Sequence, residues 1–394
     1  MSRLLRAALA LAVGVFAFVP QATAQQVPVR ELPRPAREIE DPFSLITGAM
    51  ELKPGQIILY DGVDGELVIV NFADGSRTPL GRQGSGPGEY KSIAGLFRVP
   101  GDTIWALDAA QMRVVVFTPD LKPGTTFPFM MFDAQAGTAL TAPFQSDGRG
   151  RVYSSAMKIQ AGGGRGAMSM QFPDSVGVVR LDPRAATERT EVARVRFPMS
   201  GNPKMQQNGN SFKYSMAYPG LVAADAWAVF NDGRIVIVRG ATYAVEILGP
   251  DGRTTASVRI PYDRIPVTDA DKKAEMDEAK RQMEEQGKAA QKMMPAGISM
   301  EFELLPPASW PDAYPPVAPL GALAAPNGDL WVRRAIPIRV GREQWDVLDR
   351  TGKLVARWRL PARTTIVAVG QGVVYAVRTD EDDLRYVQRV ELPR

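Results

Sequence analysis

The chain of 394 residues contains no cysteine and no histidine. Without cysteine the protein cannot form disulfides, so its fold depends on core packing alone. Without histidine it lacks the most common general base and the most common metal ligand of enzymes. The absence of histidine excludes hydrolysis by a Ser-His-Asp triad and by histidine-bound zinc.

A long apolar run is also missing. The run at the N-terminus, Ala7 to Val19, has thirteen residues, whereas a spanning helix needs about 20. Arg3 and Arg6 precede it and Ala22-Thr23-Ala24 follows it, which is the pattern of a cleavable secretory signal. We therefore predict a signal peptide over residues 1–24 and a periplasmic or secreted protein without a membrane span. A retained anchor is the alternative, and without cysteine no lipid can be attached at the mature N-terminus.

A strong charge imbalance is absent too. Removal of the two signal arginines lowers Lys plus Arg from 47 to 45, against 43 Asp plus Glu. Nucleic-acid-binding domains typically carry a clear basic excess on one face. We therefore expect no nucleic-acid partner, and the interspersed charges indicate a solvated surface.

The most regular stretch is Gly81 to Asp120, which contains a glycine-rich loop, an apolar strand, a PGD turn, the strand IWALD and the strand RVVVF. Looser copies contain IILYDGVDGELVIV before it and RVYSSAMKI, RIVIVRG, DLWVRR and GVVYAV after it. Asp-Gly and Asn-Gly turns between apolar strands are typical of antiparallel hairpins. Six units of four strands predict an all-β fold, a six-bladed β-propeller over residues 25–394. Four aromatic residues that recur on the second strands are expected in the core: Trp105, Tyr153, Trp331 and Tyr375.

The last unit lacks a fourth strand. Val27 to Leu32 (VPVREL) is predicted to supply it as the outer strand of the sixth blade, which would close the ring. Pro28 is tolerated at such an edge. The alternative is that residues 25–40, with three prolines, form a disordered leader.

The sequence GRQGSGPGEY, followed by WALD and RVVVF, resembles the NHL-type repeat, and the chain is similar to bacterial exported TolB-like six-bladed propellers. The close match covers one repeat of six. The resemblance implies a propeller scaffold that works mostly as a binding module, with some enzymes among its relatives. The glycine loop is no phosphate cradle, because it lacks the GK[ST] ending and a following helix.

Every long insertion between strands is predicted on one face of the propeller, over residues 81–92, 131–142, 161–175, 199–220 and 262–319. Function-bearing loops cluster on one face of a rigid scaffold. We therefore expect this long-loop face to bind a protein, peptide or glycan partner, with no cofactor and no catalytic residue assigned.

The insertion 262–319 is predicted to contain a helix that begins at Thr268 and Asp271, which form a capping box. Methionine and alanine recur along one side of it, and Gly287 is expected to weaken or end it. Two interpretations remain open. The helix packs on the propeller surface, or it is a lid or a partner-docking helix.

Candidate ligand-binding residues are Arg82, Glu89 and Tyr90 around the glycine loop, where an ion pair between the first two is the alternative. The insertion 199–220 adds Lys213, Tyr214 and Tyr218, where a glycan or peptide could stack. The alternative is that this insertion is a mobile loop.

A metal-assisted hydrolase of the lactonase type is the alternative function, because carboxylate and amide ligands need no histidine. The cluster Asp380 to Asp383 lacks EF-hand spacing and favours a solvated acidic loop, so no metal ligand is assigned. Asp108 and Arg113 are expected to fix the loop between their strands.

Overall fold

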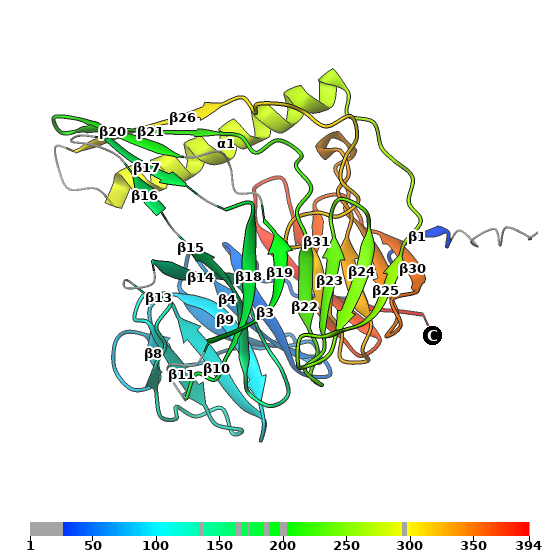
Figure 1. The fold of residues 1–394 in the computed structure, drawn as a ribbon. Coiled ribbons are helices and arrows are strands. Elements are labelled where there is room, and N and C mark those ends of the chain that lie inside the picture. The colour runs from blue at the N-terminus through cyan, green and yellow to red at the C-terminus, as the bar shows by residue number, and fades with distance from the viewer. Residues whose placement is uncertain are drawn as a thin grey trace, which may run out of the picture.

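The structure is a computed structural model, which describes residues 27–133, 137–158, 160–162, 167–171, 173–184, 189–197, 203–293 and 298–393. The predicted signal peptide lies outside the described residues. Strands dominate the described part, together with the helix α1 (Asp269–Met293) and the short 3-10 helix η1 (Ile338–Val340). Figure 1 shows most of the strands gathered into sheets below a layer that contains α1 and a few further strands. The expected mostly-β fold is confirmed.

Six sheets, named I to VI, follow one another along the described chain, and each is built on four strands. Sheet I contains β3 (Ile46–Lys53), β4 (Gln56–Asp61), β5 (Glu66–Asn71) and β6 (Arg77–Pro79). Sheet II contains β9 (Ile93–Val99), β10 (Thr103–Asp108), β11 (Arg113–Phe117) and β12 (Phe127–Pro128). Sheet III contains β14 (Thr138–Ser146), β15 (Val152–Lys158), β18 (Ser175–Leu181) and β19 (Arg189–Arg196), with the short β13 (Phe132–Asp133) at its edge.

The second half of the chain repeats the pattern. Sheet IV contains β22 (Ala226–Val229), β23 (Ile235–Arg239), β24 (Ala244–Leu248) and β25 (Thr254–Arg259). Sheet V contains β27 (Ala322–Ala324), β28 (Leu330–Arg333), β29 (Gln344–Leu348) and β30 (Leu354–Arg359). Sheet VI contains β31 (Thr364–Gly370), β32 (Val373–Thr379) and β33 (Arg385–Glu391). The short β1 (Val29–Glu31) and β2 (Arg37–Glu38) join sheets V and VI.

The second strand of each sheet is almost wholly buried, as in β4, β10 and β23. A strand buried on both faces is a nearly continuous apolar run. The four recurring aromatic residues expected in the core are confirmed there, since none is more than 3% exposed: Trp105, Tyr153, Trp331 and Tyr375.

Apolar clusters fill the space between neighbouring sheets, and each draws its residues from two of them. One cluster joins the last sheet to the first, because Tyr375 of sheet VI and Leu59 of sheet I belong to it. The first strands also contact one another in succession, β3 with β9, β9 with β14, and so on to β31, which contacts β3. The arrangement of the sheets is propeller-like.

The predicted place of the N-terminal strand is wrong. Val29–Glu31 pairs in parallel with β30 of sheet V, and the next segment, Arg37–Glu38, pairs with β33 of sheet VI. Leu32 lies in the core between these two sheets, while Ile39 and Phe43 lie in the core between sheets VI and I. The segment 27–43 therefore crosses from sheet V to sheet VI, and its buried side chains fix it to the cores between the sheets. It is not a single edge strand, and most of it is not a leader without structure.

Glu38 joins this N-terminal segment to sheet VI. Its carboxylate accepts hydrogen bonds from Arg378 Nε (2.9 Å), Arg378 Nη2 (2.8 Å) and Gln388 Nε2 (2.6 Å). The Arg378 hydrogen bond holds the pKa of Glu38 below its ordinary value. A charge-assisted bidentate pair is stronger than a neutral hydrogen bond.

We expect Glu38→Gln to lower the free energy of unfolding by on the order of 1–2 kcal/mol, because a hydrogen-bonded charge pair is lost. A carboxyl with a lowered folded pKa stabilises above its unfolded pKa, and the effect disappears as pH falls through the folded value. The difference between wild type and variant should therefore close in acid, as measured by urea unfolding at several pH values. The exposed Glu40→Gln is the control, and equal losses in both variants would contradict the assignment.

Candidate functional site

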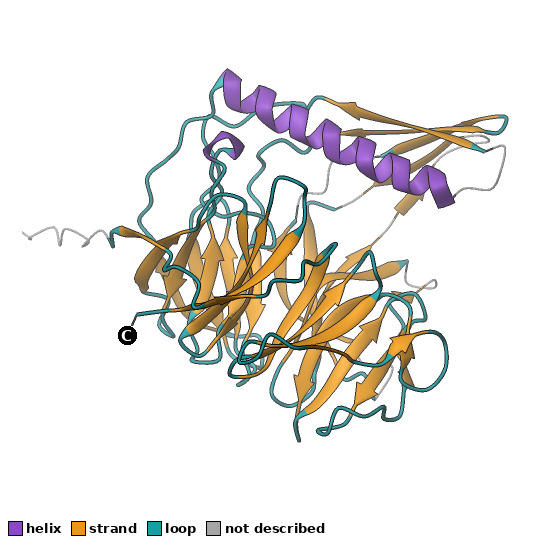
Figure 2. Cartoon of the chain, turned by 180° about the vertical axis from the view of Figure 1, so that it is seen from behind, coloured by secondary structure: helices purple, strands orange, loops and turns teal. Residues whose placement is uncertain are grey.

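Three of the predicted insertions come together over one face of the sheets. They form a separate sheet of β16 (Gln160–Gly162), β17 (Ala167–Gln171), β20 (Lys204–Asn208), β21 (Ser211–Ala217) and β26 (Ser299–Leu305). The helix α1 contacts β26 of this sheet. We call α1 and these five strands the cap, and Figures 1 and 2 show it above one side of sheets I to VI. Insertions distant in sequence thus share one face.

The predicted capping box starts α1. Thr268 N donates to Asp271 Oδ2 (3.0 Å) and Asp271 N donates to Thr268 Oγ1 (3.2 Å). Asp271 is buried and also accepts from Arg339 Nε of η1 at 2.6 Å. These hydrogen bonds, that of Thr268 first, hold the pKa of Asp271 below its ordinary value. The start of the helix is therefore tied to sheet V through the loop between β28 and β29.

The rest of α1 packs on β26 of the cap sheet. The helix does not end at Gly287, and this glycine is buried against Phe302 of β26. A Cβ there would lie 2.8 Å from the Phe302 ring, so only glycine lets the two elements approach this closely. Of the predicted apolar side, Met276, Ala279 and Met283 are partly buried.

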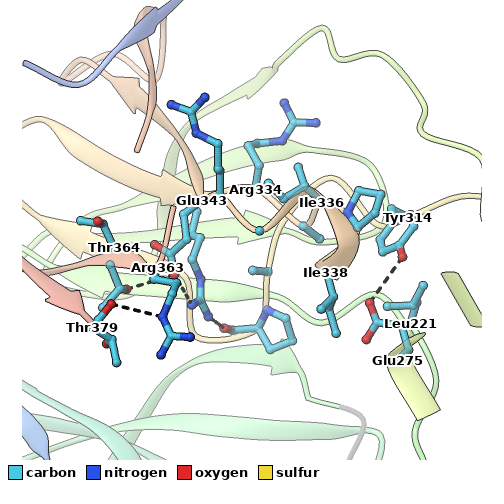
Figure 3. A pocket seen from close by; sticks show the side chains of 18 of the residues that line it. Leu221, Glu275, Tyr314, Arg334, Ile336, Ile338, Glu343, Arg363, Thr364 and Thr379 are labelled. Atoms are coloured by element: carbon cyan, nitrogen blue, oxygen red, sulfur yellow. Dashed lines mark hydrogen bonds and ion pairs between the residues drawn. The ribbon is translucent and has the colours of Figure 1, made fainter. Parts of the chain in front are cut away.

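A cavity of about 780 Å³ lies between α1 and the ends of sheets V and VI. Figure 3 shows two contrasting ends, with Glu343, Arg363, Thr364 and Thr379 at one and Ile338, Tyr314, Leu221 and Glu275 at the other. Ile336, Pro337 and Ile338 add an apolar wall. Ligand sites typically have this volume and combine apolar walls with a few convergent polar groups.

Arg363 supplies donors at the first end, the arginine end. Its Nε donates to Thr379 O (3.2 Å), and its Nη2 donates to Asp380 O and to Asp383 Oδ1 (2.8 Å). Among the described residues no acceptor is found for its Nη1. Half of the Arg363 side chain is exposed, and so is most of Asp383, so this ion pair contributes little and leaves Arg363 able to bind an anion.

Arg333 and Glu343 also line the arginine end. Arg333 Nη1 donates to Glu343 Oε1 (3.2 Å) and Nη2 donates to Pro319 O (3.3 Å). Glu343 also accepts from Trp345 Nε1 (2.8 Å) and Thr365 Oγ1 (3.0 Å). The charge of Glu343 is thus compensated, whereas each terminal nitrogen of Arg333 keeps a second N–H.

Glu275 of α1 defines the other end, the carboxyl end. Its side chain is buried, at 7% exposed, and it accepts hydrogen bonds from Tyr218 Oη (3.0 Å) and Tyr314 Oη (3.4 Å). Among the described residues no Lys or Arg forms an ion pair with it. Burial raises the pKa of Glu275, and burial together with Glu275 raises the pKa of both tyrosine hydroxyls, which therefore stay protonated as donors.

No family model matches the chain and no curated protein matches it. Solved structures are similar in outline. A “putative exported protein” from Bacteroides fragilis is 11% identical with a TM-score of 0.44, and the match covers 94% of this chain and 95% of that one. A DUF4221 family member from Bacteroides vulgatus is 10% identical with a TM-score of 0.44, covering 91% and 97%. Virginiamycin B lyase from Staphylococcus aureus is 10% identical with a TM-score of 0.41, covering 91% and 98%. Similarity at this level transfers neither family nor activity.

No helix among the described residues combines the length and the apolar character that crossing a membrane requires.

The candidates around the glycine loop support the loop itself. Arg82 Nη2 pairs with Glu89 Oε1 at 2.6 Å, and Glu89 Oε2 accepts from Gly86 N at 2.7 Å. Tyr90 is only 1% exposed and its Oη accepts from Leu67 N, so Tyr90 is a core residue and not a surface contact. The structure brings none of these three to the cavity lining.

Asp108 fixes the loop between β10 and β11, as expected, by accepting from Gln111 N (3.3 Å) and Gln111 Nε2 (2.6 Å). Asp108 and Arg113 also hold the glycine loop, which was not predicted. Asp108 is fully buried and accepts from the backbone N–H groups of Lys91 and Ser92, while Arg113 Nη2 donates to Glu89 O at 2.8 Å.

Of the three candidates in insertion 199–220, Lys213 and Tyr214 contact residues of the cap sheet, and Tyr218 contacts a residue of the cavity. Lys213 Nζ pairs with Glu303 (3.3 Å) and Glu301 (3.6 Å) of the neighbouring strand, and Tyr214 packs on Phe302 with ring centroids 5.8 Å apart. Both therefore stabilise the cap sheet. Tyr218 contacts the carboxyl end, because its hydroxyl donates to Glu275.

Seven residues of the cavity lining were not predicted from the sequence: Glu275, Tyr314, Arg333, Glu343, Arg363, Thr365 and Thr379. One local signal was present, because residues 333–343 (RRAIPIRVGRE) place four arginines at the end of β28 and in the loop after it. The other residues come from separate insertions and sheets, so no local pattern joins them.

The acidic segment 380–383 is a solvated loop, which is the interpretation that the sequence favoured. Asp380 Oδ1 accepts from Asp382 N and Leu384 N, and residues 381–383 are exposed. Within the described residues, no group of three or more acidic side chains gathers closely enough to hold a metal ion.

The pH dependence of stability should report on Glu275. Because its pKa is raised in the folded protein, folding binds a proton, and the contribution of Glu275 to stability falls as pH rises through the folded pKa. Glu275→Gln should abolish this dependence. Relative to the variant, the wild type should gain stability as pH falls from neutral toward the ordinary carboxyl pKa of 4.5, by at most about 1.4 kcal/mol per pH unit.

Urea unfolding of both proteins across this pH range measures the difference. Glu284→Gln, an exposed position on the same helix, is the matched control and should show no such trend. A constant difference between wild type and Glu275→Gln would overturn the assignment.

Proposed function

We propose that this protein is an exported six-bladed β-propeller that binds a protein, peptide or glycan ligand on its long-loop face, in the cavity under the cap. Sheets I to VI would be the blades, and the segment 262–319 a helical insertion between the fourth and fifth. The clusters that join each sheet to the next, and sheet VI to sheet I, support the closed ring. The signal pattern of residues 1–24 and the resemblance to NHL-like and TolB-like propellers support export and a binding role.

The cavity under α1 is the observation that carries the binding role. It lies on the face where the insertions gather, its volume of about 780 Å³ suits a short peptide or an oligosaccharide, and it offers donors at one end and a carboxyl at the other. The alternative, a metal-assisted hydrolase, gains no support from the described residues, since no acidic cluster of the required kind occurs among them.

Filling the cavity tests the binding role. Ala335 lines the cavity and is partly buried, so Ala335→Trp should weaken binding of any captured ligand at least tenfold. Ligands would be sought on glycan and peptide arrays and by capture from the exported fraction, then measured by calorimetry. Arg253→Trp, at an exposed turn in sheet IV, is the control. Undiminished binding to Ala335→Trp would refute the cavity as the site.

The insertion hypothesis has a separate test. Residues 268–294 would be replaced by a Gly/Ser linker of about 15 residues, which can span the roughly 37 Å length of the helix. The propeller should stay folded because its cores lie between sheets I to VI, while the cap sheet exposes Phe302 and binds a hydrophobic dye. Loss of the main cooperative transition would contradict the hypothesis.

A further inference from the structure

Glu275 is the most unusual titratable group at the cavity. A buried carboxylate is normally paired with a cation, because burial of a lone charge is costly. Glu275 has only the hydroxyls of Tyr218 and Tyr314 as described partners, although it lines an open cavity. A carboxylate offers about four acceptor positions, so one further donor fits, and a cation would compensate the charge.

The surroundings of Glu275 suit an ammonium group. Tyr314 lines the cavity beside Glu275, and behind the lining Tyr218 packs on Trp310 with ring centroids 5.8 Å apart. Aromatic faces and a carboxylate together favour an organic cation. The tyrosine hydroxyls keep the carboxylate in place, so the ammonium would meet an acceptor that is already oriented.

The arginine end has the opposite preference. Arg363 Nη1 and the second N–H groups of Arg333 remain available, and the hydroxyl of Thr379 forms no described hydrogen bond. Guanidinium groups bind carboxylates in planar, bidentate geometry. An apolar wall of Ala335, Ile336 and Ile338 lines the same cavity.

We propose that the cavity binds short apolar peptides by both free ends, with the terminal ammonium at Glu275 and the terminal carboxylate at Arg363 and Arg333. This inference rests on the proposed function and names its ligand class. Apolar side chains of the peptide lie against Ile336 and Ile338. An oligosaccharide, which has no charged ends, does not use either charged end of the cavity.

Calorimetry with leucine-rich peptides of two to five residues tests the proposal. Each peptide is used in four forms, which are free, N-acetylated, C-amidated and blocked at both ends. For the best length, we expect each single block to weaken binding to the wild type at least tenfold. Equal binding of the free and doubly blocked forms, or no binding at any length, would overturn the proposal.

Two variants assign the ends. In Glu275→Gln, N-acetylation should no longer matter while C-amidation still weakens binding. In Arg363→Gln the pattern should be reversed. The controls Glu284→Gln and Arg253→Gln, both at exposed positions, should behave as wild type. Retention of both end preferences in both variants would refute the assigned contacts.

The outcome is separable from that of the proposed function. If no peptide binds, but Ala335→Trp abolishes binding of a glycan or of a protein from the exported fraction, the binding role stands and the peptide class falls. If Ala335→Trp weakens binding of neither a peptide nor a glycan or protein ligand, the proposed function is refuted as well.

Discussion

Face-to-face packing between neighbouring sheets is the interaction on which the rest of the molecule depends. The second strands, such as β10, are buried on both faces, so no sheet can satisfy its apolar surface without a neighbour on each side. The cluster shared by sheets VI and I meets this need where the chain ends would otherwise leave a sheet uncovered. With no cysteine in the chain, this packing has no covalent support. Because it uses strand faces only, the strand ends are left free to carry insertions.

The repeat was predictable from local sequence, since strand alternation and turn residues recur in every unit. IWALD became part of β10 (Thr103–Asp108), and residues of the loop after Gly81 are hydrogen-bonded to Asp108 and Arg113. The N-terminal segment was misplaced because both candidate partners are outer strands with free edges. Contacts far apart in sequence decide between them: Glu31 pairs with Arg342 and Arg359 at sheet V, whereas Glu38 pairs with Arg378 of sheet VI.

The candidate site was predictable only as a face. Insertion lengths predicted that the insertions gather on one side of the sheets. However, β21 pairs in parallel with β26 from an insertion about 90 residues later, and no local pattern encodes that pairing. The cap it builds uses Lys213 and Tyr214 for its own stability. Of the predicted binding residues only Tyr218 contacts a cavity residue, Glu275, which the helix brings in.

The two acidic anchors of α1 differ in a way that links the cap to the cavity. Asp271 has a full set of partners, Thr268 and the cationic Arg339, so the start of the helix is held whatever the cavity contains. Glu275, one turn later, anchors the same helix through two neutral hydroxyls and bears the cost of a buried charge. A cation in the cavity would remove that cost and strengthen the anchor. By thermodynamic linkage, any interaction that fixes α1 over the sheets would then also raise the affinity of the cavity for the cation. Cap order and occupancy of the cavity are therefore coupled through one side chain.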